Sequence, residues 1–168
     1  MAHPLVKLNG IYGEIETCDW RDSANVRSLV NTITQSGLEN YFTLDFLSTT
    51  YLNYYHVPVQ ARIYADALID KYPDIITGYY NKGRALEAEN KPGKAIAEYV
   101  RALGTRIQCE YYQAETHERL ALAYSALGEK DVAVDYATKA LDIHRQYWIP
   151  DYLNERIRKL EKVKNKID

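Results

Sequence analysis

The stretch YYNKGRALEAENKPGKAIAEYVRA, residues 79–102, contains two short amphipathic segments on either side of a break at residues 90–93. Both segments carry apolar or small residues at positions i, i+4 and i+7: Tyr79, Gly83 and Leu86 in the first, then Ala95, Tyr99 and Ala102 in the second. Residues at this spacing share one face of an α-helix. The stretch therefore predicts a helical hairpin, in which the small residues Gly83 and Ala95 let two helices approach closely and Tyr99 fills the space between them.

The second-helix pattern of this hairpin returns in two other parts of the chain. It recurs 34 residues earlier as Ala61, Ala65 and Leu68, and 38 residues later as Ala133, Ala137 and Ala140. A recurrence of about 34 residues is the period of the tetratricopeptide (TPR) repeat, and on these residues the chain resembles that family. The longer second interval predicts one added helical turn near residues 105–110.

The resemblance implies an all-α fold, a superhelical stack of TPR-like helical hairpins with a C-terminal capping helix. We expect three units: an N-terminal lead-in and extra helix over residues 1–37, three TPR-like repeats over residues 38–144, and the capping helix over residues 145–168. A repeat stack leaves its last apolar face open, and a helix with a polar outer side closes it. The apolar side of that helix consists of Leu153, Ile157 and Leu160.

The N-terminal segment carries no repeat signal. Turn-forming residues such as Asn9, Gly10 and Gly13 predict an irregular or weakly extended segment over residues 1–20. The extra helix should then begin after one of two candidate capping residues, Asp22 or Ser23, and end at Gly37. Its apolar face consists of Val26, Leu29, Val30 and Ile33.

The C-terminal segment is basic. From Arg145 to Asp168 there are seven lysines and arginines against four aspartates and glutamates. Two interpretations stay open: a solvated outer face of the capping helix, or a docking patch for an acidic partner.

Composition describes a globular chain with no marked charge. Hydrophobic residues make up 46% of the sequence, charged residues 26%, and the formal net charge is −2. This balance gives no reason to expect nucleic acid as a partner. We find no apolar run long enough to enter a membrane and no secretory leader, so we expect a cytoplasmic protein. Cys18 and Cys109 fit neither a disulfide framework nor a metal site.

Catalytic and metal-binding motifs are missing from the sequence. The four histidines, His3, His56, His117 and His144, lack the spacings that place two ligands on one helical face. Cys109 and His117 would lie about 12 Å apart along a continuous helix, too far for a nucleophile and its base. We therefore predict no enzyme activity, no metal and no cofactor.

Tyrosine is unusually frequent, with 16 residues against 2 phenylalanines. Three tyrosine pairs occur, at residues 54–55, 79–80 and 111–112, and only one member of each pair can face a given core stripe. Tyrosine either replaces phenylalanine at core edges with its hydroxyl in water, or it lines a binding surface.

The first helices of a TPR array line a concave groove, which in that family receives a peptide or a helix of a partner protein. The family's inward positions correspond to Phe46, Thr50 and Asn53 in the first repeat, Tyr80, Arg84 and Glu87 in the second, and Glu118, Leu122 and Ser125 in the third. This mixture of aromatic and acidic residues favours a peptide with apolar anchors and a basic residue. Alternatively, these residues are only the solvated side of a stacking scaffold.

We predict a protein–protein interaction module, an adaptor or an assembly or co-chaperone-like scaffold whose partner is another protein or a peptide. One alternative is an accessory TPR domain of a larger enzyme or sensor. Another is a structural module that forms a homo-oligomer through its tyrosine-rich faces.

Overall fold

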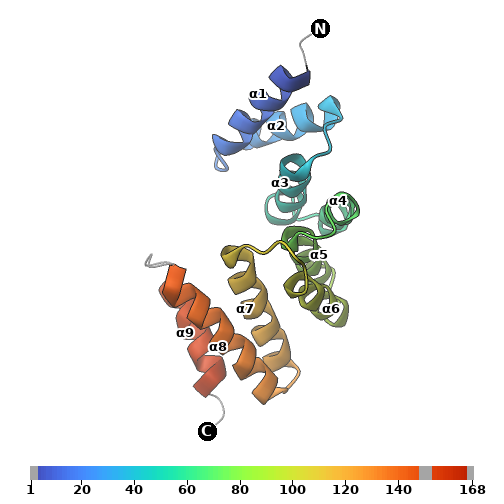
Figure 1. Cartoon of the computed structure of the whole chain (residues 1–168). Coiled ribbons are helices and arrows are strands. Elements are labelled where there is room, and N and C mark those ends of the chain that lie inside the picture. Colours follow the sequence, from blue (N-terminus) through green and yellow to red (C-terminus); the bar gives the residue numbers. More distant parts are fainter. Residues whose placement is uncertain (1–3, 148–152, 166–168) are drawn as a thin grey trace.

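The computed structural model describes residues 4–147 and 153–165, and within them the only regular elements are helices (Figure 1). The helices are α1 (Pro4–Glu16), α2 (Ser23–Ser36), α3 (Tyr41–Asn53), α4 (Pro58–Lys71), α5 (Ile76–Ala88), α6 (Pro92–Leu103), α7 (Glu110–Ala126), α8 (Lys130–Tyr147) and α9 (Leu153–Asn165). The only pairing of β type in this part of the chain is an isolated bridge between Ile75 and Ile107. The predicted all-α fold is confirmed.

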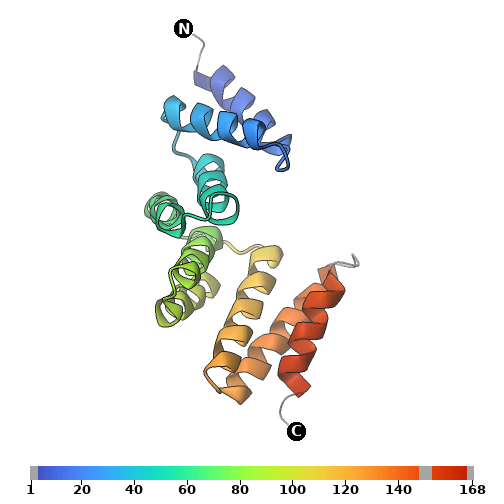
Figure 2. The same ribbon diagram turned by 180° about the vertical axis from the view of Figure 1, so that it is seen from behind.

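Successive helices pair into hairpins, and the hairpins follow one another from the N-terminal to the C-terminal end of the molecule (Figures 1 and 2). The pairs are α1–α2, α3–α4, α5–α6 and α7–α8, and α9 packs against α8. This is a helical repeat stack, as the spacing of small residues predicts.

The second helix of every hairpin buries residues at i, i+4 and i+7. These residues are Val26, Val30 and Ile33 in α2, Ala61, Ala65 and Leu68 in α4, Ala95, Tyr99 and Ala102 in α6, and Ala133, Ala137 and Ala140 in α8. Each set lies on one side of its helix, toward the centre of the stack. The residues that recur in the sequence are therefore those whose side chains pack between neighbouring helices.

The hairpin α5–α6 shows the close approach that its small residues predict. A Cβ atom added at Gly83 would overlap Cε1 of Tyr99, and the Tyr99 side chain is fully buried. No side chain other than hydrogen fits at this position without moving the tyrosine ring, because protein interiors are closely packed.

The prediction of an irregular segment over residues 1–20 is wrong, because α1 spans Pro4–Glu16. Glycine lowers helix propensity, but Ile11 and Ile15 belong to an apolar cluster that includes Leu29 of α2 and Leu47 of α3. Tertiary packing of an apolar face outweighs the weak local preference. The predicted limits of the next helix are confirmed: Asp22 accepts hydrogen bonds from two backbone amides of α2, and Gly37 ends the helix in the left-handed conformation.

The added helical turn of the third repeat lies inside α7, and the prediction of a turn near residues 105–110 is wrong. Helix α7 has 17 residues where α5 has 13. Residues 104–109 form a non-helical connection instead, in which the Ile107 amide donates to the Asp74 carbonyl at 2.8 Å and the Ile76 amide donates to the Ile107 carbonyl at 3.1 Å.

Helix α9 closes the C-terminal end of the stack. Leu160 and Val163 are buried against Ala137 and Leu141 of α8, while Lys162 is exposed. Residues 148–152 and the side chains of Leu153 and Ile157 lie outside the described residues. None of the described helices is both long enough and apolar enough to cross a membrane.

Candidate partner-binding surface

Helices α3, α5 and α7, the first helices of three successive hairpins, form one continuous face, which we call the inner face. Helix α5 contacts both α3 and α7, whereas no contact of similar extent joins α4 to α6 or α6 to α8 in the described residues. Side chains from three hairpins therefore meet on the inner face, as a binding surface for an extended ligand requires.

Polar side chains one repeat apart meet across the inner face. Asn81 donates to Asp45 at 2.7 Å, Arg84 to Asn53 at 2.6 Å, Tyr80 to Glu115 at 3.1 Å and Arg119 to Glu87 at 3.2 Å, and the Tyr41 and Thr77 hydroxyls lie 3.0 Å apart. The partners in these pairs are 31 to 36 residues apart in the sequence. The repeat period thus sets which residues become neighbours.

The structure divides the nine predicted groove residues into two groups. Four are buried, namely Phe46, Thr50, Tyr80 and Glu118. Five remain fully or partly exposed, namely Asn53, Arg84, Glu87, Leu122 and Ser125. Only the second group offers side-chain surface to a partner.

Phe46 is buried because the N-terminal hairpin packs on this end of α3. Its ring lies 5.3 Å from the ring of Trp20, and it belongs to the same apolar cluster as Ile11 and Leu29. Sequence reasoning did not predict α1, so it assigned Phe46 to the groove.

Tyr80 is buried at the junction of three helices. Its ring lies 5.2 Å from that of Tyr112, its hydroxyl donates to Glu115, and the guanidinium carbon of Arg84 lies 5.7 Å from its ring centroid. Burial raises the pKa of the Tyr80 hydroxyl, and the carboxylate of Glu115 adds to this effect. Tyr80 thus positions Arg84 and Glu115 and exposes little surface of its own.

Glu118 lies inside the hairpin α7–α8. Its carboxylate oxygen is 3.8 Å from Nε2 of His144, and both residues are buried. Their contact joins the two helices of the last hairpin rather than extending the inner face.

Two of the exposed predicted residues, Arg84 and Glu87, line a shallow depression of about 350 Å³ together with Leu52, Ala88 and Arg119. Arg84 and Arg119 are each held by a polar partner, Asn53 and Glu87 respectively. Paired polar side chains of this kind can exchange hydrogen bonds with the backbone of an incoming peptide at low cost, because exposed pairs contribute little stability.

The sequence prediction missed the polar group around Asp45 on α3. Asn81 donates to this carboxylate, and Tyr112 of α7 lowers the pKa of the carboxyl group. A signal was present, because Asp45 and Asn81 are 36 residues apart on successive first helices. Using it required knowing that α3 and α5 lie side by side in that register.

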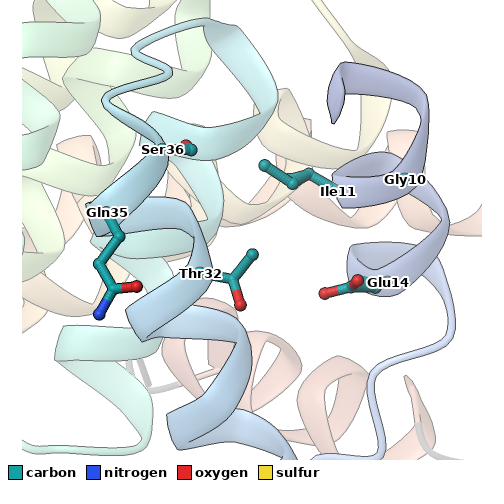
Figure 3. A pocket seen from close by; sticks show the side chains of 6 residues that line it. All are labelled: Gly10, Ile11, Glu14, Thr32, Gln35 and Ser36. Carbon is teal, nitrogen blue, oxygen red and sulfur yellow. The ribbon is translucent and has the colours of Figure 1, made fainter. Parts of the chain in front are cut away.

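A second depression, of about 470 Å³, lies between α1 and α2 (Figure 3). Figure 3 shows Ile11 and Thr32 directed into it from the two helices, and Glu14 is the ionisable residue among those that line it. One carboxylate does not make a catalytic or metal site. Across the described residues, no group of three or more histidine, cysteine, aspartate or glutamate side chains is arranged to hold a metal ion.

The sequence model of the tetratricopeptide repeat matches residues 76–106 and 114–147, which contain α5–α6 and α7–α8. The chain contains tetratricopeptide repeats. TPR hairpins are in general protein-interaction scaffolds, and the two matched hairpins support a protein–protein interaction module. How the flanking residues divide into units, at residues 37 and 144, stays a prediction.

Solved structures share the TPR fold over nearly the whole chain. One crystal structure of MamA has 19% sequence identity and a TM-score of 0.61, and the match covers 87% of this chain and 92% of that one. A second MamA structure has 18% identity and a TM-score of 0.63, with 96% and 84% covered. TTC0263, a thermophilic TPR protein in Thermus thermophilus, has 15% identity and a TM-score of 0.70, with 95% and 84% covered. At these identities the likeness concerns the fold. No curated protein sequence matches the chain.

Proposed function

We propose that the TPR stack binds a peptide or helical segment of a partner protein on its inner face and acts as an adaptor or assembly scaffold. The observation that carries this proposal is that the predicted residues Arg84 and Glu87 line one depression shared by α3, α5 and α7, with Asn53 bonded to Arg84.

The chemistry of this surface suits a peptide. Arg84 and Arg119 supply donors, Asn53 and Glu87 supply acceptors, and the side chain of Leu122 is exposed. Backbone amides and carbonyls of an extended ligand need both donors and acceptors, and an apolar contact adds burial. The inner face supplies all three within one surface.

The test is selection from a displayed random peptide library on the whole chain, followed by calorimetry. We expect selected peptides to lose affinity by about tenfold or more when Asn53→Ala and Arg84→Ala are combined. The matched control combines Lys94→Ala and Arg101→Ala, two exposed residues of the second helix α6. Peptides that lose affinity only in the α6 variant would place binding on the other side of the stack and refute the proposal. Tyr80→Ala is a poor test, because Tyr80 is buried and its loss would disturb packing.

A further inference from the structure

Asp45 is a mostly buried residue of the inner face whose hydrogen-bond partner is neutral. It accepts a hydrogen bond from Nδ2 of Asn81 at 2.7 Å, and the polar side chain of Tyr112 lowers the pKa of its carboxyl group. The positive charge of Arg84 acts on it from a longer distance, because that guanidinium is bonded to Asn53. Among the residues that the structure describes, none of the ion pairs within 4.0 Å includes Asp45. No described cation of the chain is therefore in contact with this carboxylate.

Aromatic residues occupy positions near Asp45 on two helices. Tyr41 and Phe42 precede Asp45 by four and three residues, which places them on the same side of α3. On α7, Tyr112 lies near enough to Asp45 to affect the pKa of its carboxyl group, and the Tyr112 ring lies 5.3 Å from that of Tyr111. The outermost rings are open to solvent, since Phe42 is 54% exposed and Tyr111 is 41% exposed.

The charge around this group is unbalanced toward the negative. Apart from Glu118, which lies inside the hairpin α7–α8, helices α3, α5 and α7 carry four carboxylates, Asp45, Glu87, Glu110 and Glu115, against three cations, Lys82, Arg84 and Arg119. One of these cations, Lys82, is directed away from the inner face, to Asp66 of α4 at 2.9 Å. A ligand that carries positive charge is therefore favoured on this surface.

The environment of Asp45 shows what such a ligand would supply. Loss of water raises the pKa of its carboxyl group, and the polar side chains of Asn81 and Tyr112, together with the distant charge of Arg84, only partly oppose this. These groups thus stabilise the ionised form less than a cation in contact would. A cationic side chain from a partner would complete the site.

We propose that the inner face binds an arginine side chain of a partner's peptide at Asp45, with the guanidinium paired to the carboxylate and lying against the adjoining exposed rings of Phe42 and Tyr111. This proposal rests on the proposed function and adds a chemical identity for one anchor. Arginine fits better than lysine, because its planar group both pairs with a carboxylate in two hydrogen bonds and stacks on aromatic faces.

The test uses two capped tripeptides, acetyl-Leu-Arg-Leu-amide and the same peptide with citrulline, the neutral isostere of arginine. Each is titrated into the ¹⁵N-labelled whole chain and followed by amide chemical shifts. We expect saturable shifts at Asp45, Tyr111 and the side-chain amide of Asn81 with the arginine peptide, at about tenfold lower concentration than with the citrulline peptide.

Asp45→Asn removes the charge and keeps an oxygen for Asn81, so the fold should stay intact and the preference for arginine should disappear. Asp70→Asn makes the same charge change on an exposed residue of the second helix α4 and should leave that preference unchanged. An equal response to both peptides in the wild type, or a preference that survives Asp45→Asn, would overturn the proposal. Concentration-dependent sedimentation abolished by Asp45→Asn would also overturn it, because the cation would then come from a second copy.

The two proposals fail in different ways. If library-selected peptides bind at Asn53 and Arg84 but do not prefer arginine, the arginine site is wrong while the inner face stays the binding surface. If no selected peptide depends on the inner face, the proposed function itself is wrong.

Discussion

The hairpins α5–α6 and α1–α2 share a pattern on their second helices and differ in how their first helices pack. In α5–α6, a Cβ added at Gly83 would overlap the buried ring of Tyr99. In α1–α2, Cβ atoms added at Gly10 or Gly13 would meet nothing within 4 Å, and a depression of about 470 Å³ separates the helices. The comparison shows that the pattern of buried residues on a second helix predicts that a hairpin forms. The residues of the first helix determine how closely the two helices pack.

The largest effect is expected from a substitution that weakens the attachment of the hairpin α1–α2 to α3. Phe46→Ala removes the ring that anchors α1–α2 to α3, and a buried phenylalanine replaced by alanine costs about 3 kcal/mol or more of unfolding free energy. Compared with the wild type, the variant should exchange its amide hydrogens faster in α1 and α2, with a smaller change in α5 and α6. Asn53→Ala on the same helix is the control, because Asn53 is exposed and bonds to Arg84 of α5, so it should change the attachment of α1 and α2 little. Uniform loss of protection along the whole chain would contradict a local anchor.

The next largest effect is expected from a substitution inside the closely packed hairpin α5–α6. Gly83→Ala forces the buried Tyr99 ring to move, and we expect a loss of about 2 kcal/mol in urea unfolding after the gain in helix propensity is included. Gly93→Ala in the same hairpin has open space around its Cβ and should be neutral or slightly stabilising. A Gly83→Ala chain as stable as the wild type would mean that this hairpin is no tighter than α1–α2.

A smaller effect, on the last hairpin, is visible in pH dependence. Burial lowers the pKa of His117 to about 4, with a minor contribution from the positive charge of Lys139. The unfolded chain has a histidine of ordinary pKa, near 6.5, so it binds more protons than the folded chain between about pH 6.5 and pH 4. Stability from this group is fully present above the unfolded pKa and falls as pH falls toward 4. His117→Gln should reduce that acid loss in urea unfolding, and an unchanged pH profile would argue against burial of the imidazole.

The smallest expected effect is a gain of stability in the loosely packed hairpin α1–α2. Gly10→Ala and Gly13→Ala should each stabilise α1 by about 0.5–1 kcal/mol, because alanine is the better helix former and no atom opposes the added methyl group. Circular dichroism and hydrogen exchange in α1 would measure this gain. A loss of stability would mean that α1 packs against α2 as closely as α5 packs against α6.

Repeat spacing was predictable from sequence because it depends on local helical periodicity and on a few small residues. Asp22 and Gly37 were also predictable, since a capping side chain and a left-handed glycine act within one turn of the helix. Helix α1 was not, because its stability depends on contacts of Ile11 and Ile15 with residues far along the chain. Local glycines gave the opposite signal.

The candidate site was predictable only in part, for a related reason. Family positions identify side chains that face inward in the middle of an array, but they do not say whether a further hairpin covers them, as one covers Phe46. The sequence likewise does not predict which tyrosine of each adjacent pair is buried. Only one member of each can face the core, and the structure buries Tyr80 while it leaves Tyr111 open to solvent. That choice depends on which neighbouring helix each ring meets.

The backbone contacts between the segments that precede α5 and α7 have a mechanical consequence. Ile107 bonds to Asp74 and Ile76 bonds to Ile107, and Arg106 pairs with Asp74 at 3.0 Å, so both ends of the hairpin α5–α6 are tied at one point. A pull on the two ends of the chain passes through this junction before it reaches the helices inside the loop. We expect the outer hairpins to fray first under tension, and α5–α6 to be the last part of the stack to give way.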